Sequence, residues 1–307
     1  MTIFSVVLIC VIILSIFQIV LAIIFYDFAI NTRKDRTKQF EKGKNQVIIP
    51  ELTAEEKELL KTAKDVYIKS NDNLKLHALE LKSELNKDWI IITHGYFSKA
   101  EHLMPYAIEL IKNHNLLLIE LRGHGKSEGK YIDFGIKSRY DILNWIDYIN
   151  YSYNNPKIGL YGLSMGASSI MMTANFTLPK NIKFIIEDSG FTSAKEELQY
   201  QLRKVFHFPT FPTLMLANSY IKMKHGFTIN DGSAINALQY NNVPILFIHG
   251  DDDKLVPTYM INKLYEANAG IKDKLIIKNA GHIGSMFKSK EEYWDKINKF
   301  IIKNEEI

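Results

Sequence analysis

One serine of this chain stands between two glycines, in a pattern that suits a nucleophile. The pentapeptide Gly162-Leu163-Ser164-Met165-Gly166 follows a short apolar run and precedes a helical pattern. In a tight strand-to-helix turn, a β-carbon two residues before or after the serine would crowd the neighbouring elements, so both positions need glycine. The pattern therefore predicts a nucleophile elbow at Ser164. With 16 glycines in the chain, the same spacing can also arise by chance.

A base and an acid must accompany such a serine, because its hydroxyl attacks only when a base takes the proton and an acid holds the tautomer of that base. Three aspartates, Asp251, Asp252 and Asp253, follow one apolar run, and His282 follows the last one. Nucleophile, acid and histidine thus stand in a chain order known for Ser-His-Asp triads. The spacing does not choose among the aspartates, which also suit a solvated or cation-binding loop. His282 could alternatively be a solvent-bonded loop histidine.

Acyl transfer also requires two backbone N–H groups aimed at the developing oxyanion. Met165, directly after the serine, is the first predicted donor. The second is Tyr96, in the loop after the apolar run at residues 89–92, where Gly95 lets the backbone turn. His94 in the same loop is interpreted as structural, bonded to nearby backbone.

Short, continuously apolar runs alternate with longer helical patterns from residue 89 onwards. The runs cover residues 89–92, 116–119, 158–161, 184–186, 245–248 and 275–277. The helical patterns cover residues 101–113, 136–151, 167–175, 258–269 and 291–303. Strands buried on both faces and joined by helical crossovers are typical of an α/β fold with a doubly wound, mostly parallel sheet.

Two elements are predicted ahead of this region. Residues 53–65 form an amphipathic helix that opens with a capping-box pattern, Thr53-Ala54-Glu55-Glu56. Two antiparallel strands at residues 66–69 and 74–81 then flank the turn Asn71-Asp72-Asn73, whose residues tolerate positive φ.

One interval is too long for an ordinary crossover. About 55 residues separate Asp188 from Val243, and we interpret residues 190–240 as a helical cap over the site. Its aromatic residues are Phe191, Tyr200, Phe206, Phe208, Phe211, Tyr220 and Phe227. Some of these rings are expected to line an apolar pocket, and more than half to pack the cap against the core.

The N-terminus carries a candidate membrane anchor. Residues 3–26 contain no charged residue, and 24 residues at about 1.5 Å each span the roughly 30 Å of a bilayer core. A cleaved signal peptide would have basic residues ahead of a shorter run. Cys10 is the only cysteine, so an intramolecular disulfide is impossible. It is interpreted as a thiol buried in the membrane, and lipidation is a weaker alternative.

Positive charge is concentrated just after this run. Residues 31–46 hold six Lys and Arg against two acids, and the rest of the chain is balanced. This cluster predicts contact with anionic headgroups and a cytoplasmic catalytic domain, and argues against nucleic-acid binding. A lysine-rich composition could produce it without topological meaning. The expected division is a transmembrane anchor at 1–30, a basic linker at 31–52 and a catalytic domain at 53–307.

Taken together, the motifs resemble those of the α/β-hydrolase superfamily, in the branch of serine aminopeptidases, monoacylglycerol-lipase-like enzymes and membrane-anchored bacterial esterases. They are His94-Gly95-Tyr96, the loop at residues 122–129, the serine elbow, His249-Gly250 with Asp253 and Val256-Pro257, and Gly281-His282. The resemblance covers about residues 66–303. It implies that Asp253 is the acid and that Arg122, His124 and Ser127 are structural. Asn73 departs from it, because similar chains often have glycine there.

The sequence thus predicts a serine hydrolase that cleaves esters of apolar acyl groups through Ser164, His282 and Asp253, without cofactor or metal. Peptidase, thioesterase and acyltransferase reactions use the same triad and remain alternatives. A non-catalytic, membrane-tethered binding protein on the same fold is an alternative of another class.

Overall fold

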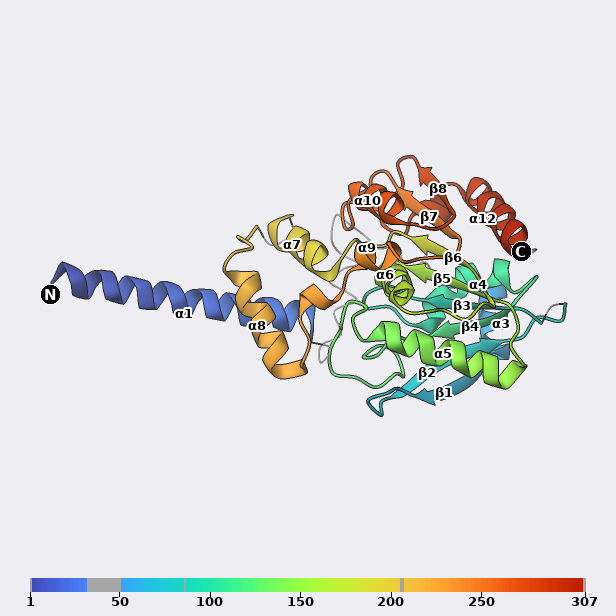
Figure 1. Ribbon diagram of the computed structural model, residues 1–307, viewed down its shortest axis with the longest axis horizontal. Coiled ribbons are helices and arrows are strands. Elements are labelled where there is room, and N and C mark those ends of the chain that lie inside the picture. Colours follow the sequence, from blue (N-terminus) through green and yellow to red (C-terminus); the bar gives the residue numbers. More distant parts are fainter. Residues whose placement is uncertain (1, 32–50, 86, 205–206, 306–307) are drawn as a thin grey trace.

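A single long helix projects from the body of the molecule at the N-terminus (Figure 1). The computed structural model describes residues 2–31, 51–85, 87–204 and 207–305. Its first helix, α1 (Ile3–Ala29), is long and apolar enough to cross a membrane. The helix runs three residues further than the predicted apolar segment. Nearly all of the predicted linker, residues 31–52, lies outside the described residues.

Within the described residues, eight strands form one sheet in the order β1-β2-β4-β3-β5-β6-β7-β8. Their bounds are β1 (Lys64–Lys69), β2 (Lys75–Leu81), β3 (Trp89–Thr93), β4 (Asn115–Ile119), β5 (Ile158–Leu163), β6 (Ile182–Asp188), β7 (Ile245–Gly250) and β8 (Lys272–Ile277). The β1–β2 and β2–β4 pairs are antiparallel, and all other pairs are parallel. The mostly parallel α/β sheet is therefore confirmed.

Helices cover the sheet on both faces (Figure 1). Those ahead of the cap are α3 (Ala54–Thr62), η1 (Ala100–Leu103), α4 (Met104–Leu110), α5 (Ser138–Tyr153), α6 (Met165–Met171) and η2 (Met172–Asn175). Those after the cap are α10 (Tyr259–Ala267), α11 (Ser285–Lys288) and α12 (Lys290–Glu305).

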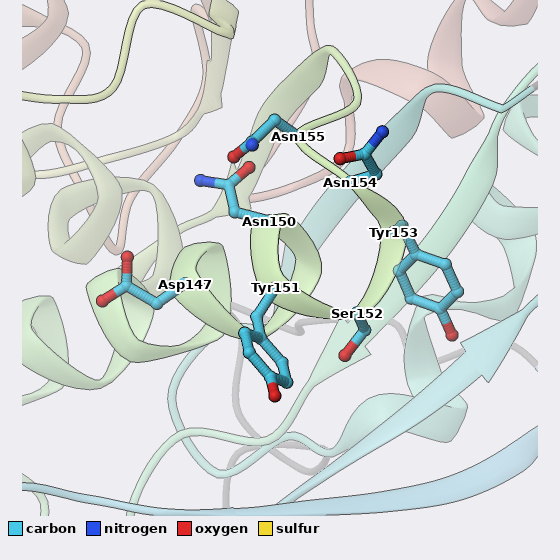
Figure 2. A pocket seen from close by; sticks show the side chains of 7 residues that line it. All are labelled: Asp147, Asn150, Tyr151, Ser152, Tyr153, Asn154 and Asn155. Atoms are coloured by element: carbon cyan, nitrogen blue, oxygen red, sulfur yellow. The ribbon is translucent and has the colours of Figure 1, made fainter.

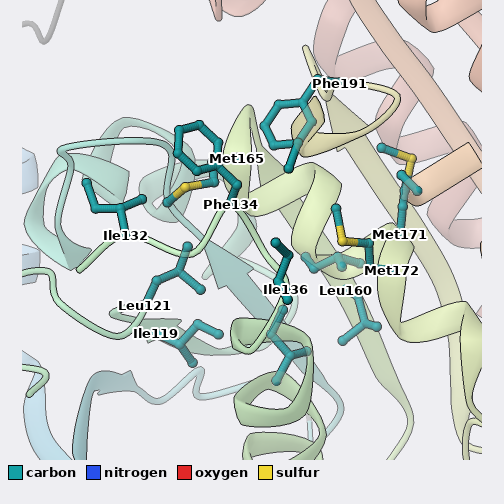
Figure 3. Close-up of a cluster of buried hydrophobic side chains, with 14 of the residues drawn as sticks. Ile119, Leu121, Ile132, Phe134, Ile136, Leu160, Met165, Met171, Met172 and Phe191 are labelled. Atoms are coloured by element: carbon teal, nitrogen blue, oxygen red, sulfur yellow. The ribbon is translucent and has the colours of Figure 1, made fainter. Parts of the chain in front are cut away.

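The central strands contain continuous apolar runs because both of their faces are covered. In β3, Trp89 and Ile91 belong to one hydrophobic cluster, whereas Ile90 and Ile92 belong to the other. Successive side chains of a strand point to opposite faces, so one continuous run supplies two cores. Figure 3 shows part of the first cluster, in which Met165 lies directly after the predicted nucleophile.

The structure corrects four predicted elements. The helix expected over residues 53–65 ends at Thr62, and Lys64 and Asp65 belong to β1. The helix expected over residues 101–113 is divided into η1 and α4, and the one expected over residues 167–175 is divided into α6 and η2. The last strand, β8, is only partly buried over most of its length, because it pairs with β7 alone at the edge of the sheet.

Two local predictions are confirmed. Thr53 and Glu56 form the reciprocal capping box at the start of α3. Asn73 has a φ of 64°, the left-handed conformation expected of this turn. Asparagine adopts that conformation more readily than most residues, so it replaces the glycine common in similar chains.

The interval between β6 and β7 contains the elements α7 (Ala194–Lys204), α8 (Thr213–His225), η3 (Ile229–Asp231) and α9 (Ala234–Leu238). Among its aromatic residues, Phe191 and Phe227 are buried in the core, and Tyr200 and Tyr220 pack against it. Phe208 and Phe211 are instead exposed, at 39% and 73%. Phe206 lies outside the described residues.

Candidate active site

Ser164 occupies a strained turn between β5 and α6. Its φ of 53° and ψ of −117° lie in a region that residues with a side chain rarely adopt. The turn is held by a hydrogen bond of 2.8 Å from the Ser164 N–H to the carbonyl of Asp188 at the end of β6. Strain of this kind persists only where the surroundings enforce it, and it is common at functional sites.

The two glycines of the elbow are required by sterics, as predicted. A β-carbon on Gly162 would lie 2.5 Å from the backbone nitrogen and Cα of Ala167. One on Gly166 would lie 2.4 Å from the carbonyl oxygen of Thr93. Both distances are far below van der Waals contact, and both neighbouring groups are backbone that cannot rotate away.

We therefore expect Gly166→Ala to destabilise the protein by at least about 1–3 kcal/mol, the usual cost of overpacking. The measurement is thermal unfolding of the full chain in detergent. Gly281→Ala is the matched control, because a β-carbon there meets no atom within 4 Å. Equal melting temperatures for the two variants would contradict the steric reading.

Ser164, His282 and Asp253 lie together in one hydrogen-bonded row. Nε2 of His282 is 2.8 Å from Oγ of Ser164, and Nδ1 of His282 is 2.7 Å from Oδ2 of Asp253. All three side chains are buried. The row joins the ends of β5, β7 and β8, because parallel strands bring their carboxyl ends to one edge of the sheet.

The structure separates the three aspartates that the sequence left open. Only Asp253 contacts His282. Asp252 pairs with Lys254 at the surface, where both side chains are 61% exposed, and Asp251 accepts a hydrogen bond from the N–H of Asn279.

The environment of Asp253 favours the carboxylate. Its Oδ1 accepts hydrogen bonds from the N–H groups of Leu255 and Val256, at 2.8 and 2.9 Å. Burial opposes ionisation, but the charges and hydrogen bonds of His282 and His249 outweigh it. They hold the pKa of Asp253 well below its usual value.

His249 is a residue of the site that the sequence analysis named only as part of a motif. Its Nε2 lies 3.2 Å from Oδ2 of Asp253 and 2.8 Å from the carbonyl oxygen of Val256. Burial acts to lower the pKa of His249, but the hydrogen bond with Asp253 raises it overall. The only signal in the sequence is its position four residues before the acid.

Two further buried acids lie close to this pair. Burial raises the pKa of both Glu187 and Glu197 to about 8. Glu197 accepts a hydrogen bond of 2.6 Å from the side chain of Gln201, and Glu187 accepts one of 2.9 Å from the N–H of Gly190. In the folded protein these carboxyl groups therefore hold their protons near neutral pH.

This predicts a pH-dependent stability. The folded protein keeps the proton of Glu197 up to about pH 8, whereas the unfolded chain loses it near 4.5, the usual pKa of this group. The free energy of unfolding should thus fall as pH rises through this window, by up to about 1.4 kcal/mol per pH unit for each such group. In denaturant titrations between pH 5 and 8, the free energy of unfolding of Glu197→Gln should fall less steeply than that of the unmodified protein. Glu291→Gln, at an exposed position of α12, is expected to behave as the unmodified protein. Identical slopes in all three proteins would contradict the prediction.

The loop after β3 lies directly against Ser164. A β-carbon on Gly95 would be 3.2 Å from Cβ of Ser164, so the backbone that leads into Tyr96 approaches the nucleophile closely. The Tyr96 hydroxyl donates to the carbonyl of Ala29 at the end of α1, at 2.8 Å. The predicted donors Tyr96 and Met165 therefore belong to the two segments that flank Ser164.

Other polar residues of the motifs serve the framework. Burial lowers the pKa of His94 to about 3, and its Nε2 accepts from the N–H of Leu121 at 3.1 Å. Arg122 binds the carboxylates of Asp72 and Asp141. The structural reading of His94 and Arg122 agrees with these contacts.

The same holds for Ser127. Its hydroxyl donates to the carbonyl of Glu120 at 2.7 Å, and its oxygen accepts from the N–H of His77. Both hydrogen bonds fix the loop of Ser127 to neighbouring backbone, and neither involves a group that could activate a nucleophile.

The cap holds the acid loop in place. The Tyr200 hydroxyl donates to the carbonyl of Lys254 at 3.2 Å, and the side-chain amide of Gln201 donates to the carbonyl of Leu255 at 2.8 Å. Both residues belong to α7. The first cap helix is therefore bonded to the residues that follow Asp253.

Two further features of the described residues bear on chemistry. No group of three or more His, Cys, Asp and Glu among them could hold a metal ion. A surface hollow at the end of α5, lined by residues 147 and 150–155, contains asparagine, tyrosine, serine and aspartate side chains (Figure 2). It includes none of the residues predicted to act in catalysis.

Comparison with known proteins identifies the family of the chain. The profile of the serine hydrolase (FSH1) family matches residues 124–284, more than half of the chain. The uncharacterized protein YqkD of Bacillus subtilis is 29% identical over 214 residues, covering 69% of this chain and 70% of that one. The uncharacterized membrane protein YNL320W of Saccharomyces cerevisiae is 23% identical over 241 residues, covering 76% and 77%.

A solved structure resembles the chain over nearly its own full length. The esterase Pf2001 of Pyrococcus furiosus superimposes with a TM-score of 0.66 at 25% identity. The alignment covers 84% of this chain and 98% of the esterase.

Proposed function

Because the chain belongs to the serine hydrolase (FSH1) family, we propose that it cleaves carboxylic esters of apolar acyl groups through Ser164, His282 and Asp253. The observation that carries the proposal is the hydrogen-bonded row from Oγ of Ser164 through His282 to Oδ2 of Asp253. The likeness to an esterase structure supports the choice of ester as the bond that is cleaved.

In the first half of the reaction, Oγ of Ser164 attacks the ester carbonyl carbon, and its proton passes to Nε2 of His282. The backbone N–H groups of Tyr96 and Met165 stabilise the oxyanion that forms. The carbon–oxygen bond to the alcohol then breaks, and His282 returns the proton to the leaving oxygen. In the second half, His282 takes a proton from water and the hydroxide adds to the acyl-enzyme. The carboxylic acid product then leaves as His282 returns the proton to Oγ of Ser164.

Asp253 orients His282 and stabilises the imidazolium that forms twice in each cycle. Its Oδ2 accepts a hydrogen bond from the Nδ1–H of His282, which leaves Nε2 without a proton and able to accept the one from Ser164. A carboxylate whose pKa is held well below its usual value stays charged at neutral pH.

A panel of p-nitrophenyl esters of graded acyl length, run beside aminoacyl substrates and thioesters, tests the substrate class. We expect the highest kcat/KM for esters with apolar chains. Preference for an aminoacyl amide would identify a peptidase, and preference for the thioester a thioesterase. Transfer of the acyl group to an added alcohol in place of water would identify an acyltransferase.

We also propose that α1 anchors the enzyme in a membrane as a single span, with the catalytic domain on the cytoplasmic side. The length and composition of α1 support the span, and the basic cluster of residues 31–46 supports the orientation. A yeast relative bears the name of a membrane protein. Protease treatment of intact and of opened cells tests the orientation. Digestion of the domain in intact cells would contradict it.

A further inference from the structure

The exposed part of α1 has the length of a bilayer core. From Ile3 to Val20 nearly every residue is exposed, and fully buried positions begin at Ala22. These 18 residues span about 27 Å, against roughly 30 Å of hydrocarbon. If this stretch crosses the membrane, the body of the protein begins where the hydrocarbon ends.

The cap helix α8 lies alongside α1 at this boundary (Figure 1). At its start, the hydroxyl of Thr213 donates to Oε1 of Gln18 at 3.0 Å. At its end, Nε2 of His225 is 2.7 Å from the hydroxyl of Tyr26. Eight residues of α1 separate these two contacts, which is about 12 Å along the helix axis. The start of α8 is therefore the part of the cap nearest to the exposed stretch of α1.

The contact of Gln18 also places the start of α8 at the edge of the membrane span. A polar side chain in a membrane span is costly unless it has a partner. Here the partner is a side chain of the cap, so the beginning of α8 lies at the level of the polar interruption in α1.

The exposed surface of the cap combines apolar side chains with cations. Near the start of α8, three apolar side chains are exposed at 39–73%: Phe208, Phe211 and Met215. Near its end, Met223 is exposed as well, between the exposed Lys222 and Lys224. Arg203 and Lys204 are exposed at the end of α7, and residues 203–225 contain no Asp or Glu. Exposed apolar side chains with cations beside them and no acids are typical of a segment at the boundary of anionic lipids.

We propose that Phe208, Phe211 and Met215, here called the interfacial patch, insert into the surface of an anionic phospholipid bilayer and that acyl substrates enter the site from it. The proposal rests on the proposed anchoring role of α1. It also explains why two aromatic rings of the cap are exposed, at 39% and 73%.

Two elements next to the interfacial patch, α1 and α7, are hydrogen-bonded to segments of the active site. The end of α1 accepts a hydrogen bond from Tyr96 of the proposed oxyanion loop. The helix α7, which leads into the interfacial patch, is bonded to the loop of Asp253. A substrate chain that leaves the bilayer beside α8 would thus meet the segments that surround Ser164.

The test is fluorescence quenching with the full chain reconstituted in vesicles of phosphatidylcholine and phosphatidylglycerol. An environment-sensitive dye is attached to the native Cys10, or to Phe211→Cys, Met215→Cys or Ile302→Cys in a Cys10→Ala background. Ile302 is the matched control, because it is 60% exposed on α12 at the opposite end of the molecule. We expect doxyl-labelled lipids to quench the dye at positions 10, 211 and 215 but not at 302.

Each of the other outcomes would refute one part of the proposal. Quenching at position 10 without quenching at 211 and 215 would leave the anchor and refute the interfacial patch. Absence of quenching at position 10 would refute the anchor and the patch with it. A dye at 215 that is shielded from water but not quenched, with cross-linking between chains, would show that a second copy covers the patch.

Activity provides the second readout. In Phe211→Ser/Met215→Ser, the ratio of the rate on a long-chain ester in vesicles to the rate on a water-soluble short-chain ester should fall at least about tenfold. Ile302→Ser should keep the ratio of the unmodified protein. An unchanged ratio in the double variant would refute entry from the bilayer. If neither ester is cleaved by the unmodified protein, the proposed function fails, and the quenching result still decides the patch.

Discussion

Replacing Ser164 with alanine is expected to lower kcat/KM for esters by a factor on the order of 10⁴ or more, and His282→Ala should cost about as much. The reason is that nucleophile and base act as one unit. Without His282, the proton of the Ser164 hydroxyl has no acceptor within 2.8 Å, and without Ser164 there is no hydroxyl to activate. The double variant should therefore be no slower than either single variant.

A fluorophosphonate probe reports on the same pair without a natural substrate. The unmodified protein should be labelled, Ser164→Ala should not, and the exposed Ser152→Ala serves as a control that should label fully. Labelling that persists in Ser164→Ala would place the nucleophile elsewhere. A folded, unlabelled native protein would favour the non-catalytic binding protein over the enzyme.

Replacing Asp253 with asparagine is expected to lower kcat by a factor of about 10⁴ through the tautomer of His282. The amide oxygen must take the place of Oδ1, because two backbone N–H groups donate there. The amide NH₂ then faces Nδ1 of His282, where the carboxylate accepted a hydrogen bond. Two donors cannot pair, so His282 would carry its proton on Nε2 and could not accept one from Ser164.

The neighbouring aspartate offers a matched control for this prediction. Asp252→Asn removes the same charge one residue away, but its partner is the largely exposed Lys254 and not the base. Its kcat should stay within a few-fold of the native value, since exposed ion pairs contribute little. Equal losses of kcat in the two variants would show that the negative charge of the loop is what matters, and that the hydrogen-bond geometry of Asp253 is not.

Several features of the fold could be predicted because their causes are local. The constraint on Gly162, the capping box of Thr53 and the positive φ of Asn73 each depend on residues within five positions of one another. Gly166 differs, because the group that a β-carbon there would meet is the carbonyl of Thr93 at the end of β3. The continuous apolar runs of the central strands indicated a sheet covered on both faces before any pairing was known. The edge strand β8 was misjudged because a run of apolar residues does not reveal that a strand lacks a second neighbour.

The residues of the candidate site could be proposed from sequence because each follows a strand in an order that few folds use. Among the three aspartates, however, the residues alone allowed no choice, and a family resemblance was needed to favour Asp253. The structure shows why the others differ, since Asp252 points to a surface lysine. The contact of His249 with Asp253 could not be predicted either, because it requires the turn after β7 to fold back on the strand.

The amino-acid sequence was therefore enough to determine the α/β class, the elbow serine with a later acid and histidine, and an apolar helix long enough to cross a membrane. These follow from periodicity, backbone sterics and chain order, which are recognisable without knowing which distant residues meet. Only the tertiary structure decided which aspartate meets His282, that α1 is bonded to both Tyr96 and the cap, and that Phe208 and Phe211 remain exposed. Those relations join residues up to about 200 positions apart, and only packing of the complete chain brings such residues into contact.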